Sequence, residues 1–166
     1  RVVIPKEIRR TLRIREGDPL EIFTDAQGGV IFRKYSPVGE LSAFAAEYAE
    51  VLHHTANLPT MICDRDHIVA VAGVSKKEYL EHRITPELEE YLKSRHSFIS
   101  APGDRTRLCP VEGMERAAAI VWPIIARSDV TGAVITLQQE DKPSPSEMEA
   151  KLVQVAASFL GRQMEE

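Results

Sequence analysis

The fold of the first part of this chain is decided by residues 1–12, RVVIPKEIRRTL. The β-branched run at 2–4 predicts the end of a strand. Pro5 ends that strand and suits the first turn of a helix, where its missing N–H is not needed. Ile8 and Leu12 follow four residues apart, so they share one face of a short helix, and the arginines between them project away from that face.

A β-hairpin is predicted next, over residues 19–34. Alternating apolar residues at 20–24 indicate one strand, and the apolar run at 30–33 indicates the return strand. Gly28 and Gly29 lie between them and allow the positive φ angles of a tight turn. A unit of about 35 residues cannot enclose a hydrophobic core alone, so these strands leave their apolar side chains without a core of their own.

This opening part resembles the swapped-hairpin DNA-binding domain of the AbrB family. The agreement begins in RVVIPKEIRR, continues at Leu12, Ile14, Gly17 and Leu20, and covers residues 1–35. The resemblance implies that two chains interleave their hairpins into one shared β-barrel, which makes dimerisation part of folding. The family's domain begins with one more strand upstream. Because this chain starts inside the motif without a Met, we expect residue 1 to be the start of a truncated chain with that first strand missing.

The cations of the opening stretch are the candidate DNA-binding residues. Arginine donates two parallel hydrogen bonds to guanine or phosphate, whereas lysine offers a point charge suited to phosphate. The resemblance implies that the DNA-contacting arginines are Arg1, Arg9 and Arg10, and the residue chemistry adds Lys6. Phosphate contacts by two such sets in a dimer are expected to supply most of the affinity for double-stranded DNA. The alternative for Arg9 or Arg10 is an ion pair with Glu7 or with an acid of the hairpin.

Charge is distributed unevenly along the chain. The net charge of the 166 residues is −4, yet residues 1–35 carry eight Lys and Arg against five Asp and Glu. Residues 36–166 carry thirteen against twenty. A basic beginning on an acidic body indicates that only the beginning meets a polyanion, although a solvated basic face is the commoner fate of such a cluster.

The rest of the chain predicts an α+β sandwich around one antiparallel sheet. Apolar residues at three- and four-residue steps indicate a helix over 38–52 and a last helix over 148–164, which Ser146 caps. Apolar strands lie between these helices, whereas residues 96–116 are poorly patterned.

The strands of this second part resemble those of a GAF domain. The resemblance rests on the run at 62–66 and on the two apolar strands within 121–135. It divides the chain into an AbrB-type domain at 1–35, a linking helix at 36–57 and a GAF-like regulatory domain at 58–166.

The GAF resemblance implies a small-molecule pocket between the sheet and its covering helices. The candidate lining residues are Val71, Tyr79, Tyr91, Trp122 and Ile135. Ordinary core packing is the alternative for each of them. A cyclic nucleotide is not expected, because the signature of cyclic-nucleotide GAF domains is absent. Arg95, Arg105 and Arg107 either face an anionic ligand or belong to a solvated loop.

No enzymatic activity, metal site, cofactor or membrane span is predicted. The sequence lacks the P-loop, GxSxG, HExxH and Rossmann fingerprints. Cys63 and Cys109 have no metal-ligand spacing and are expected to be small core residues in a reducing cytosol. Asp64 and Asp66 indicate a turn. No apolar run approaches the roughly 18 residues that a membrane span needs.

The sequence therefore predicts a DNA-binding transcriptional regulator. The two resemblances together imply a sporulation role in the cytoplasm of the forespore, at its nucleoid, with both activation and repression of genes. We expect a second dimer contact on the sheet and the striped helices, and two different two-fold contacts give a closed tetramer. The alternative is an antitoxin-like interaction protein, because AbrB-type domains also occur in antitoxins whose tails wrap a toxin.

Overall fold

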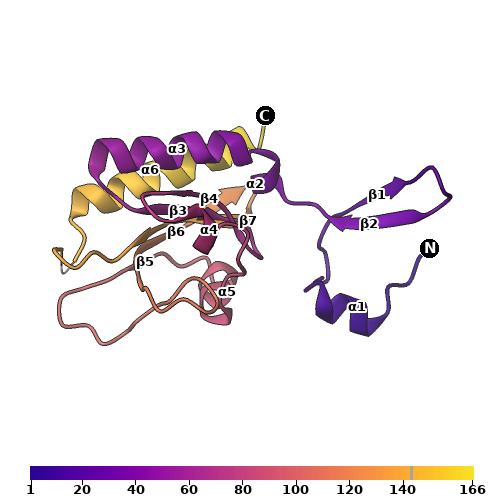
Figure 1. Ribbon diagram of the computed structural model, residues 1–166, viewed down its shortest axis with the longest axis horizontal. Helices are drawn as coiled ribbons and strands as arrows, with labels where there is room; N and C mark the ends of the chain where they lie inside the picture. The colour runs from indigo at the N-terminus through magenta and orange to yellow at the C-terminus, as the bar shows by residue number, and fades with distance from the viewer. Residues whose placement is uncertain (143) are drawn as a thin grey trace. The chain divides into compact units, whose positions relative to one another are not determined.

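The computed structural model describes residues 1–142 and 144–166 and divides into two compact units, Arg1–Ser36 and Pro37–Glu166 (Figure 1). The first unit holds one helix and a two-stranded sheet, namely α1 (Lys6–Thr11), β1 (Leu20–Thr24) and β2 (Val30–Lys34). The second unit holds a five-stranded sheet and the remaining helices.

The short helix predicted after Pro5 is present as α1. The N–H of Arg9 donates to the carbonyl of Pro5 at 3.0 Å, so the helix begins directly after the proline. It ends at Thr11, with Leu12 as its C-cap. The next residue, Arg13, has a left-handed φ of 53°, and the N–H of Ile14 reaches back to the carbonyl of Arg9 at 2.8 Å. A backward bond of this kind satisfies a carbonyl in the last turn of a helix. Residues 2–4, by contrast, are not in a strand. That prediction was wrong for the single chain, because a strand needs a neighbour to pair with.

The predicted hairpin is confirmed as β1 and β2. The strands pair antiparallel, with Leu20 opposite Lys34 and Ile22 opposite Phe32. The carboxylate of Asp25 closes the turn by accepting from the N–H of Gln27 at 2.9 Å and from that of Gly29 at 2.6 Å.

The first unit buries none of its residues: every residue of 1–36 is exposed or half-buried. Large apolar side chains stand in solvent along the whole unit, at exposed fractions of 81% for Val3, 63% for Ile22 and 59% for Val30. A single copy of this unit therefore has no hydrophobic core.

The second unit is built on an antiparallel sheet with the strand order β4-β3-β7-β6-β5. Its strands are β3 (Thr60–Cys63), β4 (Ile68–Ala72), β5 (Phe98–Ile99), β6 (Ala118–Ala126) and β7 (Asp129–Leu137). Its helices are α2 (Pro37–Glu40), α3 (Ser42–Ala56), α4 (Lys76–Tyr79), α5 (Pro86–Lys93) and α6 (Glu147–Gln163).

Each face of this sheet carries its own buried cluster. The helices α3 and α6 lie side by side over one face (Figure 1), where Ala49 and Leu160 pack on Ile62 and Val134. On the opposite face α4 and α5 contribute to a second cluster, which also contains Met61, Val121 and Ile135. Successive strand residues point to opposite faces. The continuous apolar runs of β3, β6 and β7 follow from this, because both faces are covered.

The two striped helices differ in how closely they match the predictions. The helix expected over 38–52 is broken at Leu41 into α2 and α3, and α3 ends at Asn57 with a left-handed φ of 54°. The last helix begins as expected at a capping box, in which Ser146 accepts from the N–H of Glu149 at 3.1 Å and the Glu149 carboxylate accepts from the N–H of Ser146 at 3.4 Å.

Candidate nucleic-acid interface

The four cations predicted to bind DNA are all exposed. Lys6, Arg9 and Arg10 lie on α1, and Arg1 lies in the extended segment before it. Among the described residues, none of the four makes an ion pair, so the alternative in which Glu7 neutralises Arg9 or Arg10 is not what the structure has. Residues 1–15 carry six cations and one acid. Unpaired guanidinium groups keep their donors available for phosphate or for the guanine edge.

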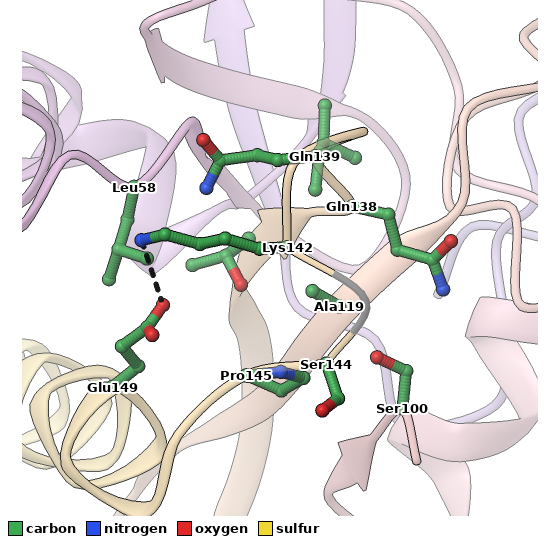
Figure 2. Close-up of a pocket in the computed structure, with 11 residues that line it drawn as sticks. Leu58, Ser100, Ala119, Gln138, Gln139, Lys142, Ser144, Pro145 and Glu149 are labelled. Atoms are coloured by element: carbon green, nitrogen blue, oxygen red, sulfur yellow. Dashed lines mark ion pairs between the residues drawn. The ribbon is translucent and has the colours of Figure 1, made fainter. Parts of the chain in front are cut away.

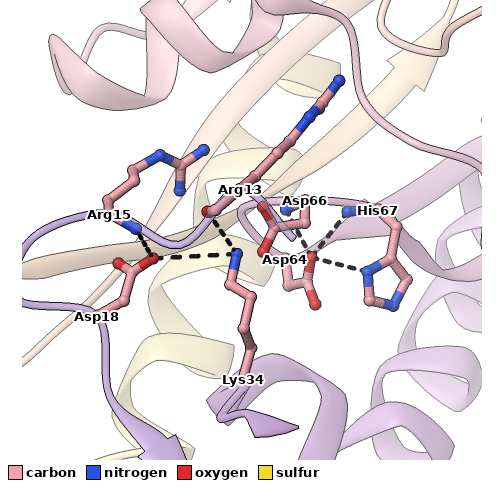
Figure 3. A network of polar contacts seen from close by, with 7 residues as sticks. All are labelled: Arg13, Arg15, Asp18, Lys34, Asp64, Asp66 and His67. Carbon is pink, nitrogen blue, oxygen red and sulfur yellow. Dashed lines mark hydrogen bonds and ion pairs between the residues drawn. The ribbon is translucent and has the colours of Figure 1, made fainter. Parts of the chain in front are cut away.

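The segment that follows α1 is tied to the hairpin by a polar network within the first unit (Figure 3). The ammonium group of Lys34, at the end of β2, donates to the carbonyl of Arg13 at 3.0 Å and lies 3.9 Å from the carboxylate of Asp18. The carboxylate of Asp18 also accepts a hydrogen bond from the N–H of Arg15 at 2.8 Å. These bonds attach the C-terminal end of α1 to β2, so the cations on α1 are held on a structured element.

One exposed cation of the hairpin was missed by the sequence argument. Arg33 lies on β2 with its guanidinium carbon 5.2 Å from the centre of the Phe23 ring, which is a cation–π contact. The sequence gives only a weak indication of this contact, namely that Arg33 and Phe23 lie on the two strands of the predicted hairpin. Arg33 lies two residues along β2 from Ile31, the direct cross-strand partner of Phe23, so Arg33 and Phe23 are diagonal neighbours on one face of the hairpin.

The candidate ligand-lining residues do not surround one pocket. Val71, Tyr79 and Ile135 are buried in the cluster on the α4–α5 face, and Tyr91 packs against that cluster with an edge-on contact to Phe98. These four therefore share one face of the sheet, whereas Trp122 packs against the cluster under α3 and α6 on the opposite face. Trp122 is separated from the other four because it follows Val121 on β6, and successive strand residues point to opposite faces of the sheet.

Trp122 instead lines an apolar groove on the α6 side of the sheet. The groove has a volume of about 690 Å³, and its other apolar walls are Ile99 and the first turns of α6, including Met148. The sequence does not predict this groove, because nothing in the pattern shows that β5 is only two residues long and leaves the neighbouring part of β6 uncovered.

The remaining arginines considered for a ligand are engaged with the backbone or lie in solvent. Arg95 donates to the carbonyl of Ser128, and Arg107 donates to the carbonyl of Glu115. Arg105 is exposed. The solvated-loop alternative therefore describes this region better than an anion site does.

The two cysteines occupy different environments. Cys63 is fully buried in β3, and burial raises the pKa of its thiol well above the usual range. A thiol kept protonated in this way is a poor nucleophile. Cys109 is half-buried and lies outside the strands, and its thiol donates to the carbonyl of Glu115 at 3.4 Å.

The Asp64–Asp66 segment is the turn that the sequence indicates (Figure 3). The carboxylate of Asp64 accepts from the N–H of Asp66 at 2.7 Å and from that of His67 at 2.8 Å, and the His67 ring lies 3.4 Å away. Within residues 1–142 and 144–166, no three His, Cys, Asp or Glu side chains are grouped closely enough to hold a metal ion. Over the same residues, no helix is long and apolar enough to cross a membrane.

Solved structures with a similar fold include GAF domains. One from an Acinetobacter phosphoenolpyruvate-protein phosphotransferase aligns over 75% of this chain and 81% of its own, at 12% identity and a TM-score of 0.60. A GAF/HD domain protein from Geobacter sulfurreducens aligns over 77% and 95%, at 17% identity and a TM-score of 0.54. A free methionine-R-sulfoxide reductase from Thermoplasma acidophilum aligns over 75% and 94%, at 10% identity and a TM-score of 0.51. Identities this low show the fold alone, and the predicted GAF-like fold is confirmed.

Sequence comparisons cover both parts of the chain. A family model described as the antidote-toxin recognition domain MazE, a bacterial antitoxin, matches residues 1–40, which supports the AbrB-type domain. A model described as the C-terminal part of stage V sporulation protein T, a transcription factor, matches residues 40–165. Stage V sporulation protein T of Bacillus subtilis is 47% identical over all of this chain and 92% of its own length. The chain therefore belongs to the family of stage V sporulation protein T.

Proposed function

We propose that this protein is a transcriptional regulator of sporulation genes that binds double-stranded DNA through Arg1, Lys6, Arg9 and Arg10. The observation that carries the proposal is that all four cations are exposed and, among the described residues, free of ion pairs. Family membership supports the role, since the matching C-terminal model is that of a transcription factor. The proposed place of action is the cytoplasm of the forespore, at the nucleoid, with activation of some genes and repression of others.

Dimerisation through the first unit is part of this proposal. A unit without one buried residue, with Val3, Ile22 and Val30 in solvent, needs a second copy to cover its apolar side chains. Interleaved hairpins would supply that cover and would also bring two copies of α1 to one DNA surface. Cations on a shared barrel are then placed at a fixed spacing along the duplex.

A second contact between copies is proposed on α3 and α6. Phe159 of α6 packs against Phe44 and Tyr48 of α3, with ring centres 5.8 Å apart in both pairs. Around this aromatic cluster, Val51 and Val155 are 58% and 57% exposed. Two different two-fold contacts, one on each unit, produce a closed tetramer. A tetramer with two DNA-binding barrels favours paired sites through effective concentration.

The proposed role of the second unit is to sense a small molecule and to alter DNA binding. The GAF fold supports a sensing domain. Native mass spectrometry of protein purified from its own host tests this, because a retained small molecule would appear as a mass increment on the tetramer. A ligand-free spectrum from every growth phase would count against sensing while leaving the DNA-binding proposal intact.

An antitoxin-like interaction protein is the second candidate, because residues 1–40 match an antitoxin family model. The second unit argues against it. Antitoxin tails are usually short and disordered, whereas residues 37–166 form a folded unit with buried clusters on both faces of a sheet.

Fluorescence anisotropy with duplex DNA tests the proposed DNA binding. The full chain should bind more tightly as the salt concentration falls, because binding releases counterions. The double variant Arg9→Ala and Arg10→Ala should weaken binding on every duplex sequence. The matched control Lys76→Ala and Lys77→Ala removes the same charge from exposed positions on α4 and should leave binding unchanged. Equal losses in the two double variants would count against Arg9 and Arg10 as DNA-contacting residues. Binding that ignores salt, or no binding by the full chain, would favour the antitoxin-like alternative.

A further inference from the structure

A small polar cavity lies in the second unit where the sheet meets the beginning of α6. Its volume is about 10 Å³. Figure 2 shows its walls, which include Ser100 after β5, Ala119 of β6, Lys142 and Ser144 before α6, and Glu149 in the first turn of α6. Thr136 of β7 completes the sheet side. The cavity shares Pro145 with the groove beside Trp122, and it shares Leu137 with the buried cluster on the α4–α5 face.

Two buried hydroxyl groups line this cavity. Thr136 is 1% exposed and Ser100 is 6% exposed. The hydroxyl oxygens of both have no hydrogen-bond partner among the described residues. Buried hydroxyls in folded proteins nearly always have a partner, from the protein or from ordered water. Two orphaned hydroxyls in one cavity therefore point to a shared partner that is not part of the chain.

The cavity has further polar walls in Gln138, Gln139, Lys142 and Ser144, and its acidic group is the carboxylate of Glu149. Its side chain is largely buried, and it serves the start of α6 in two ways. It accepts from the N–H and the hydroxyl of Ser146, at 3.4 Å and 3.1 Å, and it lies 3.9 Å from the ammonium group of Lys142. A carboxylate has about four lone-pair sites, so Glu149 retains capacity to accept a further bond from inside the cavity.

We propose that this cavity is a hydration site in which one water molecule bonds to Ser100, Thr136 and Glu149. The volume matches one water molecule, since a buried water needs a cavity of about 10–15 Å³, and it is too small for a metabolite. The chemistry matches as well, because buried waters typically make about three hydrogen bonds to polar groups that otherwise lack partners. The water links β5 and β7 to the capping box of α6, and it thereby fixes the N-terminal end of the helix on the sheet.

A high-resolution crystal structure of the full chain tests the site directly. We expect one spherical density peak within hydrogen-bonding distance of the Ser100 and Thr136 oxygens, present in every copy. Three results would overturn the proposal: no peak, a peak bonded to only one of the two hydroxyls, or density larger than one water molecule. This test does not depend on any variant folding.

A double-mutant cycle tests whether the two hydroxyls share one partner. Ser100→Ala and Thr136→Val each remove one hydroxyl, and the second substitution is nearly isosteric. If one water serves both, the double variant should lower the melting temperature by clearly less than the sum of the two single shifts, and Thr136→Ser should retain most of the wild-type melting temperature. The control pairs Ser100→Ala with Thr131→Val, which removes a hydroxyl that already donates to the carbonyl of Ile124 at 3.1 Å, and its shifts should add. Additive shifts in the Ser100–Thr136 pair would contradict a shared water.

Discussion

Gly161 of α6 lies directly against the backbone of Ile125 in β6, since a Cβ atom on Gly161 would be 2.3 Å from the Ile125 carbonyl oxygen. No real Cβ atom approaches a carbonyl this closely, so this contact fixes how near the end of α6 comes to the sheet. The glycine serves close packing here rather than flexibility.

Replacing this glycine should therefore destabilise the second unit. Alanine usually stabilises a helix interior relative to glycine by about 1 kcal/mol, but overpacking a filled interface costs about 1–3 kcal/mol. The clash involves backbone atoms that cannot rotate away, so we expect Gly161→Ala to lower the free energy of unfolding by about 1–2 kcal/mol. Urea unfolding measures it. The exposed control Ser158→Ala should stay within about 0.5 kcal/mol of wild type, and an equally stable Gly161→Ala would show that α6 can move off β6.

Dimerisation through the hairpin makes a sharp prediction for Ile22. A substitution at a side chain that is 63% exposed should change stability by no more than about 0.5 kcal/mol if the single copy is the functional form. If a second copy covers Ile22, then Ile22→Asp buries a charge, and both dimerisation and DNA binding should be lost. Light scattering after gel filtration gives the mass. Ile99→Asp, at a residue 45% exposed on β5, is the control and should keep the wild-type mass.

The proposed tetramer leads to a separate prediction for Val155. Val155→Asp places a charge in the middle of the exposed apolar stripe of α6, so it should convert a tetramer into a dimer that still binds one DNA site. Ser158→Asp adds the same charge to the polar side of the same helix and should leave the tetramer intact. Sedimentation velocity distinguishes the species. A Val155→Asp protein that remains a tetramer would remove α6 from the second contact.

Alkaline pH should destabilise the second unit through Cys63. Burial, and then the neighbouring charge of Asp64, raises the pKa of the folded-state thiol above its ordinary value of 9.0. The stability that comes from this difference between the folded and unfolded pKa of Cys63 is fully present below the unfolded-state pKa. It is lost as the pH rises above that value, because the unfolded chain releases the thiol proton while the folded chain keeps it. The resulting slope is at most about 1.36 kcal/mol per pH unit.

Unfolding free energies measured between about pH 8 and pH 10 check this sign. Cys63→Ala should start from a lower stability, because it leaves a small cavity, but should show a shallower alkaline slope. Cys109→Ala should keep the wild-type slope. If all three proteins share one slope, other groups titrate in this range and Cys63 does not contribute.

Local signals in the sequence were sufficient for most of the secondary structure. Pro5 before α1, the Asp25–Gly29 turn and the Ser146–Glu149 capping box each act over four or five residues, and the structure has all three. The strand expected at 2–4 depends on a partner strand from outside the single chain. The β-branched residues at 2–4 favour a strand, but a single copy offers no neighbouring strand for them to pair with.

The position of Trp122 could not be predicted, because β6 is apolar on both faces. A strand covered on one side alternates polar and apolar residues and so reports its orientation, whereas the run from Ala118 to Ala126 does not alternate. A register shift between Ala118 and Ile120 removes the remaining clue. The cavity at Ser100 and Thr136 could not be predicted either, since these residues are 36 positions apart and line one cavity only when β5, β6 and β7 assemble.

The absence of a buried residue in the first unit affects how the protein would respond to its own concentration in the cell. Under the proposed dimer, the DNA-reading surface forms only when two molecules meet, so occupancy of an operator should rise more steeply than the copy number of the protein. Below a threshold abundance the chains would be separate and silent. Synthesis and turnover of the regulator can then act as a switch without any change in its affinity for DNA.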